Sequence, residues 1–195
     1  MRDELNSHRP AKILILGGVR SGKSRYAAEI ATARAIAVTL IATGSAQDAE
    51  MAERIELHRT HRPKEWLVVE EPIRLAAALD AACAPSRTVI VDCLTLWLTN
   101  LMCGGDPGAL RREYAGLLEI FPRLTGACVL VSNEVGFGII PANALARRFA
   151  DEAGRLHQDL AALCDQVVLM VAGLPLGLKE PAGTRGELLP GNRGS

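Results

Sequence analysis

The clearest chemistry-bearing pattern in this sequence is the segment GGVRSGKS, residues 17–24. Gly17 is followed by four residues and then by the triplet GKS, which is the spacing of a phosphate-binding loop. Glycines let backbone N–H groups close around a phosphate, Lys23 can reach the β- and γ-phosphate oxygens, and the Ser24 hydroxyl is a ligand for Mg²⁺. The pattern predicts nucleoside triphosphate binding. The structural alternative is a glycine-rich turn before an ordinary helix.

A second candidate is the carboxylate that ends the apolar run TVIVD, residues 88–92. In proteins with a phosphate-binding loop, an acidic residue at such a strand end holds Mg²⁺ or its water. Asp92 is therefore predicted to share the metal with Ser24. A helix N-cap is the structural alternative, because the helix-prone segment LTLWLTNLM follows, and both roles can hold together.

The third candidate is a block of histidines and arginines, RIELHRTHRP, at residues 54–63. An imidazole nitrogen can attack phosphorus and form a phosphoramidate, and neighbouring arginines neutralise charge on phosphoryl oxygens. His58 and His61 share this surrounding composition, so the chemistry by itself leaves both open. The alternative is an ordinary solvated face of a charged helix.

Alternating apolar and helix-prone segments must position these residues. We expect strands at residues 12–16, 36–42, 66–69, 88–92, 127–131 and 166–171, and helices at 23–34, 48–62, 73–83, 94–102, 109–124 and 144–163. This alternation predicts an α/β fold with a mainly parallel sheet and helices on both faces. The turn at residues 43–45 follows the second strand, at the edge where open α/β sheets bind ligands.

Length and composition restrict the domain organisation and the class of protein. The 195 residues suit one domain, expected at residues 11–180, with flexible segments at 1–10 and 181–195. The formal net charge of zero argues against a nucleic-acid partner. No apolar run reaches the ~18 residues of a membrane span, and no hydrophobic stretch marks a signal peptide. Five cysteines without a CxxC pair indicate a reducing, cytoplasmic location.

Four segments together resemble one enzyme family. They are GGVRSGKSRYAAE, IATGSAQDAEMAERIELHRTHRP, VDCLTLWLTNL and VSNEVGFGIIPANALARRFADEAGRLHQDLA. In order, and within residues 12–179, they resemble the bifunctional adenosylcobinamide kinase / adenosylcobinamide-phosphate guanylyltransferase family of cobalamin (vitamin B12) synthesis. The histidine block and VSNEVGFGIIP are the most restrictive parts of this resemblance.

The resemblance implies a RecA-like P-loop NTPase domain that assembles as a homotrimer, with GTP or ATP and the corrinoid adenosylcobinamide as substrates. An NTP phosphorylates the hydroxyl of adenosylcobinamide. GTP then donates GMP to that phosphate, giving adenosylcobinamide-GDP and pyrophosphate.

The same resemblance implies the site residues. It selects His58 as the catalytic residue that carries the guanylyl group, with Lys23 as the second catalytic residue. It implies nucleotide contacts at Gly17, Gly18, Val19, Arg20, Ser21, Gly22, Lys23, Ser24, Ala42, Thr43, Gly44, Arg59, Thr60, His61, Arg62, Glu70 and Asp92, with Mg²⁺ at Ser24 and Asp92. The residues themselves leave Asn133 and Glu134 open between a corrinoid contact, a subunit interface and plain packing.

The sequence leaves two alternative functions. A P-loop small-molecule kinase without a covalent step would form no nucleotidyl-enzyme. A nucleotide-dependent regulatory module such as a GTPase would carry an NKxD-type motif, which this sequence lacks. Both leave the histidine block without a role.

Overall fold

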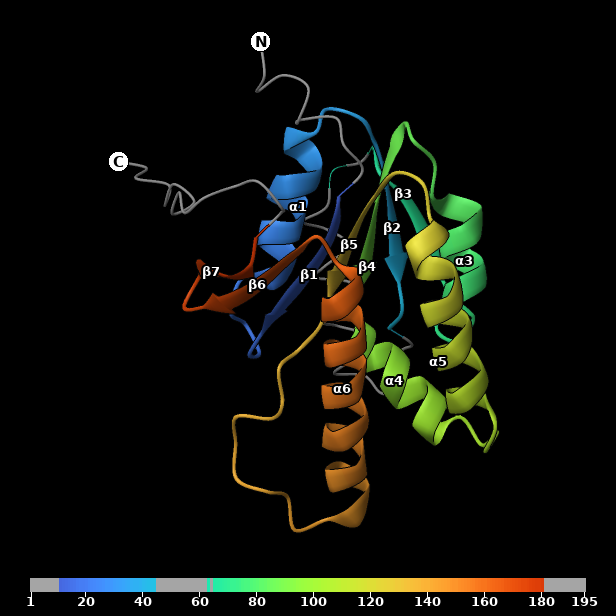
Figure 1. Cartoon of the computed structure of the whole chain (residues 1–195), viewed down its shortest axis with the longest axis vertical. Helices are drawn as coiled ribbons and strands as arrows, with labels where there is room; N and C mark the ends of the chain where they lie inside the picture. The colour runs from blue at the N-terminus through green and yellow to red at the C-terminus, as the bar shows by residue number, and fades with distance from the viewer. Residues whose placement is uncertain (1–10, 45–62, 64, 181–195) are drawn as a thin grey trace.

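The computed structural model describes residues 11–44, 63 and 65–180. Predictions for residues 1–10, 45–62 and 181–195, among them the helix at 48–62 and both flexible ends, lie outside the described residues. In the described part of the chain, seven strands form one sheet in the order β3-β2-β4-β5-β1-β6-β7 (Figure 1). Their bounds are β1 Lys12–Gly17, β2 Ala37–Ala42, β3 Leu67–Glu70, β4 Arg87–Asp92, β5 Ala127–Val131, β6 Gln166–Val171 and β7 Leu174–Lys179.

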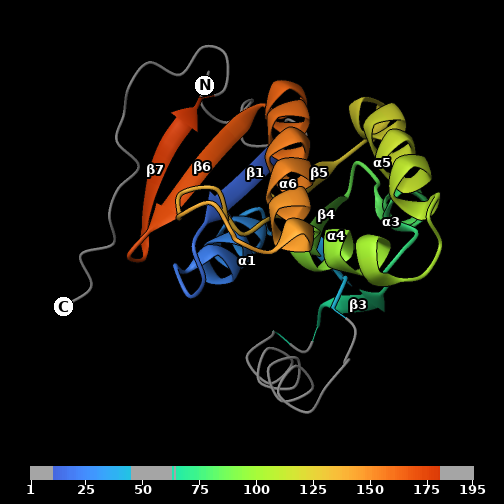
Figure 2. The same cartoon turned by 90° about the horizontal axis from the view of Figure 1, so that it is seen from below.

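Helices cover both faces of the sheet, as the sequence predicted. They are α1 Lys23–Ala33, α3 Leu75–Ala82, α4 Leu94–Cys103, α5 Ala109–Ile120 and α6 Ala144–Leu163. Figure 2 shows α1 on one face and α5 and α6 on the other. None of the helices in the described part of the chain is long and apolar enough to cross a membrane.

Two apolar cores fill the space between the sheet and its helices. On one face Ala27 and Ala31 of α1 pack against buried residues of the central strands. On the other face lie the larger side chains of α3 to α6, including Trp97 and Leu156. Branched, apolar residues point to both faces of β1, β4 and β5, as parallel strands buried on both sides require.

The parallel pairing brings the carboxyl ends of neighbouring strands together. Strand β5 lies between β1 and β4 and pairs with both in parallel, so Asp92 of β4 stands opposite Val131 of β5. On its other side β1 pairs with β6, which places Gly17 opposite Met170. The six strands that pair in parallel are β3, β2, β4, β5, β1 and β6. Their carboxyl ends therefore lie at one edge of the sheet, where the phosphate-binding loop begins.

The strand predicted at residues 166–171 is confirmed as β6, but the sequence analysis missed a strand that follows it. Residues 174–179 form β7, antiparallel to β6. Ala172 and Gly173 both have positive φ, 51° and 82°, which is the backbone of a two-residue hairpin turn. Pro175 and Gly177 conceal the strand in the sequence, because both weaken a strand pattern and are tolerated at a sheet edge.

Most other boundaries agree with the sequence to within two residues. The larger difference is the helix predicted at 109–124, which ends as α5 at Ile120 and continues as a 3₁₀ turn over Phe121–Arg123. Pro122 lies in that turn, and its missing N–H cannot extend an α-helix.

Candidate nucleotide site

The predicted phosphate-binding loop joins β1 to α1, and glycine shapes it at two positions. Gly17 has φ 151°, and a Cβ there would meet the carbonyl oxygen of Met170 at 2.5 Å and Ser21 Oγ at 2.7 Å. Gly22 has φ 95° and precedes the first residue of α1. A Cβ on Gly18 would meet nothing within 4 Å. The loop conformation thus requires glycine at both ends of the motif and leaves open space at Gly18.

Lys23 occupies the first position of α1 and points back into the loop. Its side chain is buried, and Nζ donates to the carbonyl oxygen of Gly18 at 2.6 Å. Burial lowers the pKa of this ammonium group, while the charges of Cys93 and Asp92 act in the opposite direction. A cation closed over its own loop has the chemistry to bind a phosphate there.

Other loop residues divide between exposed and buried. Val19 and Arg20 are exposed, and Arg20 has φ 56°. Ser21 Oγ is buried without a hydrogen-bond partner among the described residues. Ser24 lies half-buried in the first turn of α1. The N-terminus of this helix therefore presents backbone donors and hydroxyls where an anion binds most favourably.

Asp92 ends β4 at the same edge of the sheet, half-buried and close enough to Lys23 for their charges to interact. The helix-capping alternative for this residue is wrong, because Cys93 is the N-cap of α4 and makes no side-chain cap hydrogen bond. Within the described ranges no three His, Cys, Asp or Glu residues form a metal cluster. One hydroxyl and one carboxylate fit Mg²⁺, which takes its remaining ligands from nucleotide phosphates and water.

Thr43 joins two strand ends. Its Oγ1 donates to the carbonyl oxygen of Cys93 at 2.6 Å and accepts from the Cys93 N–H at 2.9 Å. Asn100 of α4 donates to the Thr43 carbonyl at 2.8 Å. The Thr43 side chain thus has a structural task that sequence reasoning missed. Its half-buried neighbours Ala42 and Gly44 lie at the same edge.

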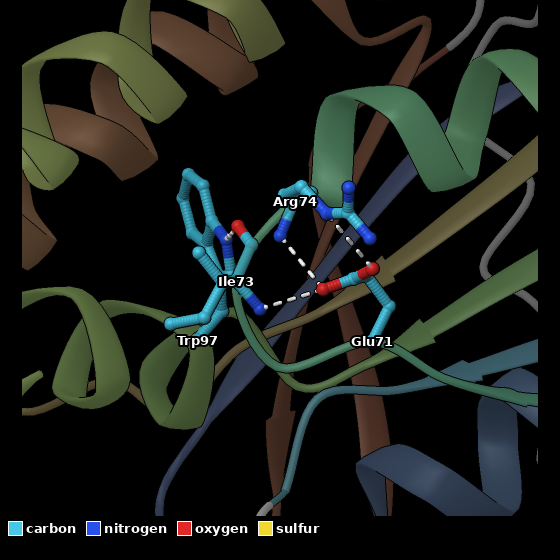
Figure 3. Close-up of polar contacts among 4 residues, drawn as sticks. All are labelled: Glu71, Ile73, Arg74 and Trp97. Atoms are coloured by element: carbon cyan, nitrogen blue, oxygen red, sulfur yellow. Dashed lines mark hydrogen bonds and ion pairs between the residues drawn. The ribbon is translucent and has the colours of Figure 1, made fainter.

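Glu70 ends β3 and stands opposite Ala42 in the sheet register, which places it at the carboxyl edge. Its neighbour Glu71 builds the start of α3, as Figure 3 shows. The Glu71 carboxylate accepts from the N–H groups of Ile73 at 3.0 Å and Arg74 at 2.8 Å. Trp97 Nε1 donates to the Ile73 carbonyl at 2.7 Å, so α4 supports the same turn.

The histidine block lies outside the described residues. His58, Arg59, Thr60, His61 and Arg62 therefore receive no position relative to the phosphate-binding loop.

A polar network that sequence reasoning did not assign lies beside the loop. Ser132, directly after β5, contacts His157 of α6, with 2.7 Å between Oγ and Nε2. His157 Nδ1 lies 3.6 Å from Glu134 Oε2. Burial lowers the pKa of His157, and the Glu134 charge acts in the opposite direction. The polar triplet after an apolar strand was the only signal in the sequence, because a histidine in a long helix is common.

The same segment is bonded to its neighbours through its backbone and Asn133. The N–H of Glu134 donates to the Gly17 carbonyl oxygen at 2.9 Å, and that of Ser132 donates to Ile15 at the same distance. Asn133 Nδ2 donates to Thr95 Oγ1 at 2.9 Å. Residues 132–134 therefore connect the phosphate-binding loop to α4 and α6.

An open cavity of about 490 Å³ extends from this region. The loop between β5 and α6 and the helices α4 and α6 form its largely apolar wall, which includes Met102, Val135 and Phe149. The same loop exposes further apolar side chains, with Phe137 82 % and Ile139 97 % accessible. Exposed apolar surface of this kind marks a place where a ligand or another chain binds.

Three features define a nucleotide-binding P-loop protein: a glycine-containing loop after β1, a buried lysine at the start of α1, and an acidic residue at the end of β4, which is separated from β1 by β5. The fold agrees. The RadB recombinase matches 92 % of this chain and 84 % of its own at TM-score 0.54 and 14 % identity. The flagellar accessory protein FlaH of Methanocaldococcus jannaschii matches 92 % and 85 % at TM-score 0.51 and 13 % identity.

Residues 13–178 match the model of the cobinamide kinase / cobinamide phosphate guanyltransferase family, and the chain belongs to this family. The bifunctional adenosylcobalamin biosynthesis protein CobP of Pseudomonas aeruginosa is 51 % identical over 166 residues, which cover 85 % of this chain and 96 % of that protein. CobU of Escherichia coli is 41 % identical over 180 residues, covering 86 % of this chain and 99 % of that protein. The predicted family is confirmed.

Proposed function

We propose that this cobinamide kinase and cobinamide phosphate guanylyltransferase of cobalamin biosynthesis uses the loop of residues 17–24 for both of its reactions. The carrying observation is the convergence of Lys23 and Asp92 at one sheet edge, around a loop that glycine holds open. In the kinase step the loop holds the triphosphate of ATP or GTP with its γ-phosphate toward the acceptor. In the transfer step it holds the pyrophosphate end of GTP. Family membership displaces the monofunctional-kinase and regulatory-module alternatives.

Mg²⁺ bound with the nucleotide would supply charge neutralisation at the phosphates, and Ser24 and Asp92 are the groups that would hold it. Lys23 stabilises the leaving oxygen in both steps as a fixed cation. We assign the remaining nucleotide contacts to the loop backbone, to Ala42, Thr43 and Gly44, and to Glu70, all of which stand at the carboxyl edge.

The transfer step proceeds through His58. A neutral ring nitrogen of His58 attacks the α-phosphorus of GTP, a P–N bond forms, and pyrophosphate leaves. A phosphate oxygen of cobinamide phosphate then attacks the same phosphorus, and His58 leaves. Arg59 and Arg62 stabilise the charge that develops on the phosphoryl oxygens and favour the unprotonated imidazole. Family membership and the composition of the block RIELHRTHRP support this assignment.

Labelling tests the covalent step. Incubation with α-labelled GTP, without a corrinoid, should leave a label on the protein that is labile in acid and stable in base. A His58→Ala variant should lose this label, because no other group in the block is assigned to the P–N bond. His61→Ala is the matched control and should keep it. Labelling of His58→Ala at the wild-type level would remove His58 from the mechanism.

The corrinoid acceptor is proposed to pack against the cavity beside α4 and α6. Helix α4 begins two residues after Asp92, and Met102 lies about 12 Å further along its axis. This separation suits an acceptor whose reacting hydroxyl points at the γ-phosphate while its bulky apolar macrocycle lies beside the helices.

We also propose a homotrimer in the cytoplasm. The exposed apolar loop between β5 and α6 and the exposed leucines of β7 support association of several chains. All five cysteines are free, as a reducing compartment requires, and cell fractionation tests the location.

A further inference from the structure

The two reactions differ in their need for a base. The kinase acceptor is a hydroxyl, which must lose its proton as its oxygen bonds to phosphorus. The transferase acceptor is a phosphate, which is already an anion at neutral pH. A proton acceptor at this site would therefore serve one step and leave the other unaffected. Lys23 is a cation and Asp92 is assigned to the metal, so neither fills this role.

Glu134 lies beside the phosphate-binding loop. Its N–H donates to the Gly17 carbonyl oxygen, and the next loop residue, Gly18, accepts from Lys23 Nζ at 2.6 Å. The lysine of this motif marks the β- and γ-phosphate end of a nucleotide. Glu134 is thus bonded to the part of the loop next to the phosphate that is transferred.

Neighbouring groups fix the Glu134 carboxylate, which stays partly exposed to solvent. Oε1 accepts from the Gly136 N–H at 2.6 Å, and Oε2 lies 3.6 Å from His157 Nδ1. Each carboxylate oxygen has two acceptor sites, so each keeps one for a substrate. The side chain remains 17 % exposed, which gives a ligand access to it.

The neighbours of His157 favour one of its two neutral tautomers. A neutral imidazole has one N–H and one acceptor nitrogen. Because an ionised carboxylate only accepts hydrogen bonds, the tautomer with the proton on Nδ1, which faces Glu134 at 3.6 Å, is favoured. Nε2 then accepts from the hydroxyl of Ser132, which is buried and 2.7 Å away. Ser132 in turn is bonded through its backbone to β1.

We propose that Glu134 is the catalytic proton acceptor of the kinase step and that His157 is its positioning residue. The hydroxyl oxygen of the acceptor bonds to the γ-phosphorus, and its proton passes to Glu134. The bond from the γ-phosphorus to the β–γ bridging oxygen breaks, and the nucleoside diphosphate leaves with the electron pair. Glu134 afterwards returns the proton to water. The inference rests on the kinase activity of the family and is independent of His58.

The test measures both steps on the full chain, in the oligomeric form in which it is purified. The kinase step uses cobinamide and NTP, and the transfer step uses prepared cobinamide phosphate and GTP. Glu134→Gln keeps the size of the side chain and cannot take a proton. We expect its kinase kcat to fall about 100-fold or more, with GMP transfer unchanged. Glu119→Gln is the matched control and should leave both steps unchanged, because Glu119 is an exposed carboxylate on α5 that pairs with Arg123 of the following 3₁₀ turn.

His157→Gln tests positioning. We expect kinase kcat to fall about 10-fold, because a misplaced base is less effective. The KM for NTP and the rate of GMP transfer should both stay unchanged. The double variant with Glu134→Gln should lose no more than Glu134→Gln does, since His157 acts through that carboxylate.

A purely structural network would lower both steps together in every variant. Glu134→Asp, which keeps a base but shortens its reach, guards against a misfolded glutamine variant and should lose more kinase than transfer activity. Full kinase activity in Glu134→Gln, or equal loss of both steps in both Glu134 variants, overturns the proposal. If the labelling experiment showed that His58 carries no guanylyl group, the proposal for Glu134 would still stand.

Discussion

At the scale of single residues, the candidate nucleotide site requires glycine at some positions of the phosphate-binding loop and charged side chains at others. Gly17 and Gly22 have backbone conformations that L side chains rarely adopt, whereas Gly18 lies in open space. The Lys23 ammonium group is bonded to the Gly18 carbonyl oxygen, and the backbone N–H of Glu134 is bonded to that of Gly17. Small changes in the loop backbone would therefore shift both charges.

Gly17→Ala tests this dependence. The new Cβ would overlap the Met170 carbonyl and Ser21 Oγ at a strained φ, so we expect the free energy of unfolding to fall by about 1–3 kcal/mol. Tm should then drop by about 2–4 °C for each kcal/mol. Gly18→Ala is the control and should leave Tm unchanged, because its Cβ meets no atom. An unchanged Tm in Gly17→Ala would contradict the tight contact.

At the scale of elements, the strand order decides which residues meet. Because β5 is inserted between β1 and β4, the segment after β5 reaches the phosphate-binding loop on one side and α4 on the other. The loop from β5 to α6 and the helices α4 and α6 then line the open cavity proposed for the corrinoid. Nucleotide and acceptor would thus contact adjoining parts of the same strand-end edge.

Phe149→Ala tests the cavity at this scale. Removing the ring takes apolar surface from the cavity wall, so we expect KM for the corrinoid to rise about 10-fold with KM for NTP unchanged. Phe149→Leu, which keeps an apolar side chain, should stay close to wild type. If Phe149→Ala instead changes the oligomeric mass and leaves KM for the corrinoid as it was, the cavity belongs to a subunit contact.

At the scale of the whole molecule, one sheet carries two activities and a large exposed apolar surface. Light scattering on a sizing column should give a mass about three times the chain's 20.8 kDa at micromolar concentration. Association would bury apolar side chains such as Phe137 and Leu176, which are otherwise costly in water. A single-chain mass under these conditions would contradict the trimer.

Sequence by itself determined the fold class, the family, the phosphate-binding loop and the acidic end of β4. These features are local. Glycine spacing, a run of branched apolar residues and a helix-prone segment each predict the backbone structure of the residues that carry them. The missed strand β7 has the opposite cause, because Pro175 and Gly177 weaken its local signal and pairing with β6 supplies the stabilisation.

Only the tertiary structure decided the partners of Thr43, Ser132 and Glu134. Thr43 pairs with Cys93, 50 residues further on, and Ser132 pairs with His157, 25 residues away on another element. Such contacts depend on strand order and helix placement, which no spacing in the sequence encodes. The polar triplet after β5 was visible in the sequence, but its place beside the phosphate-binding loop follows from the insertion of β5 between β1 and β4.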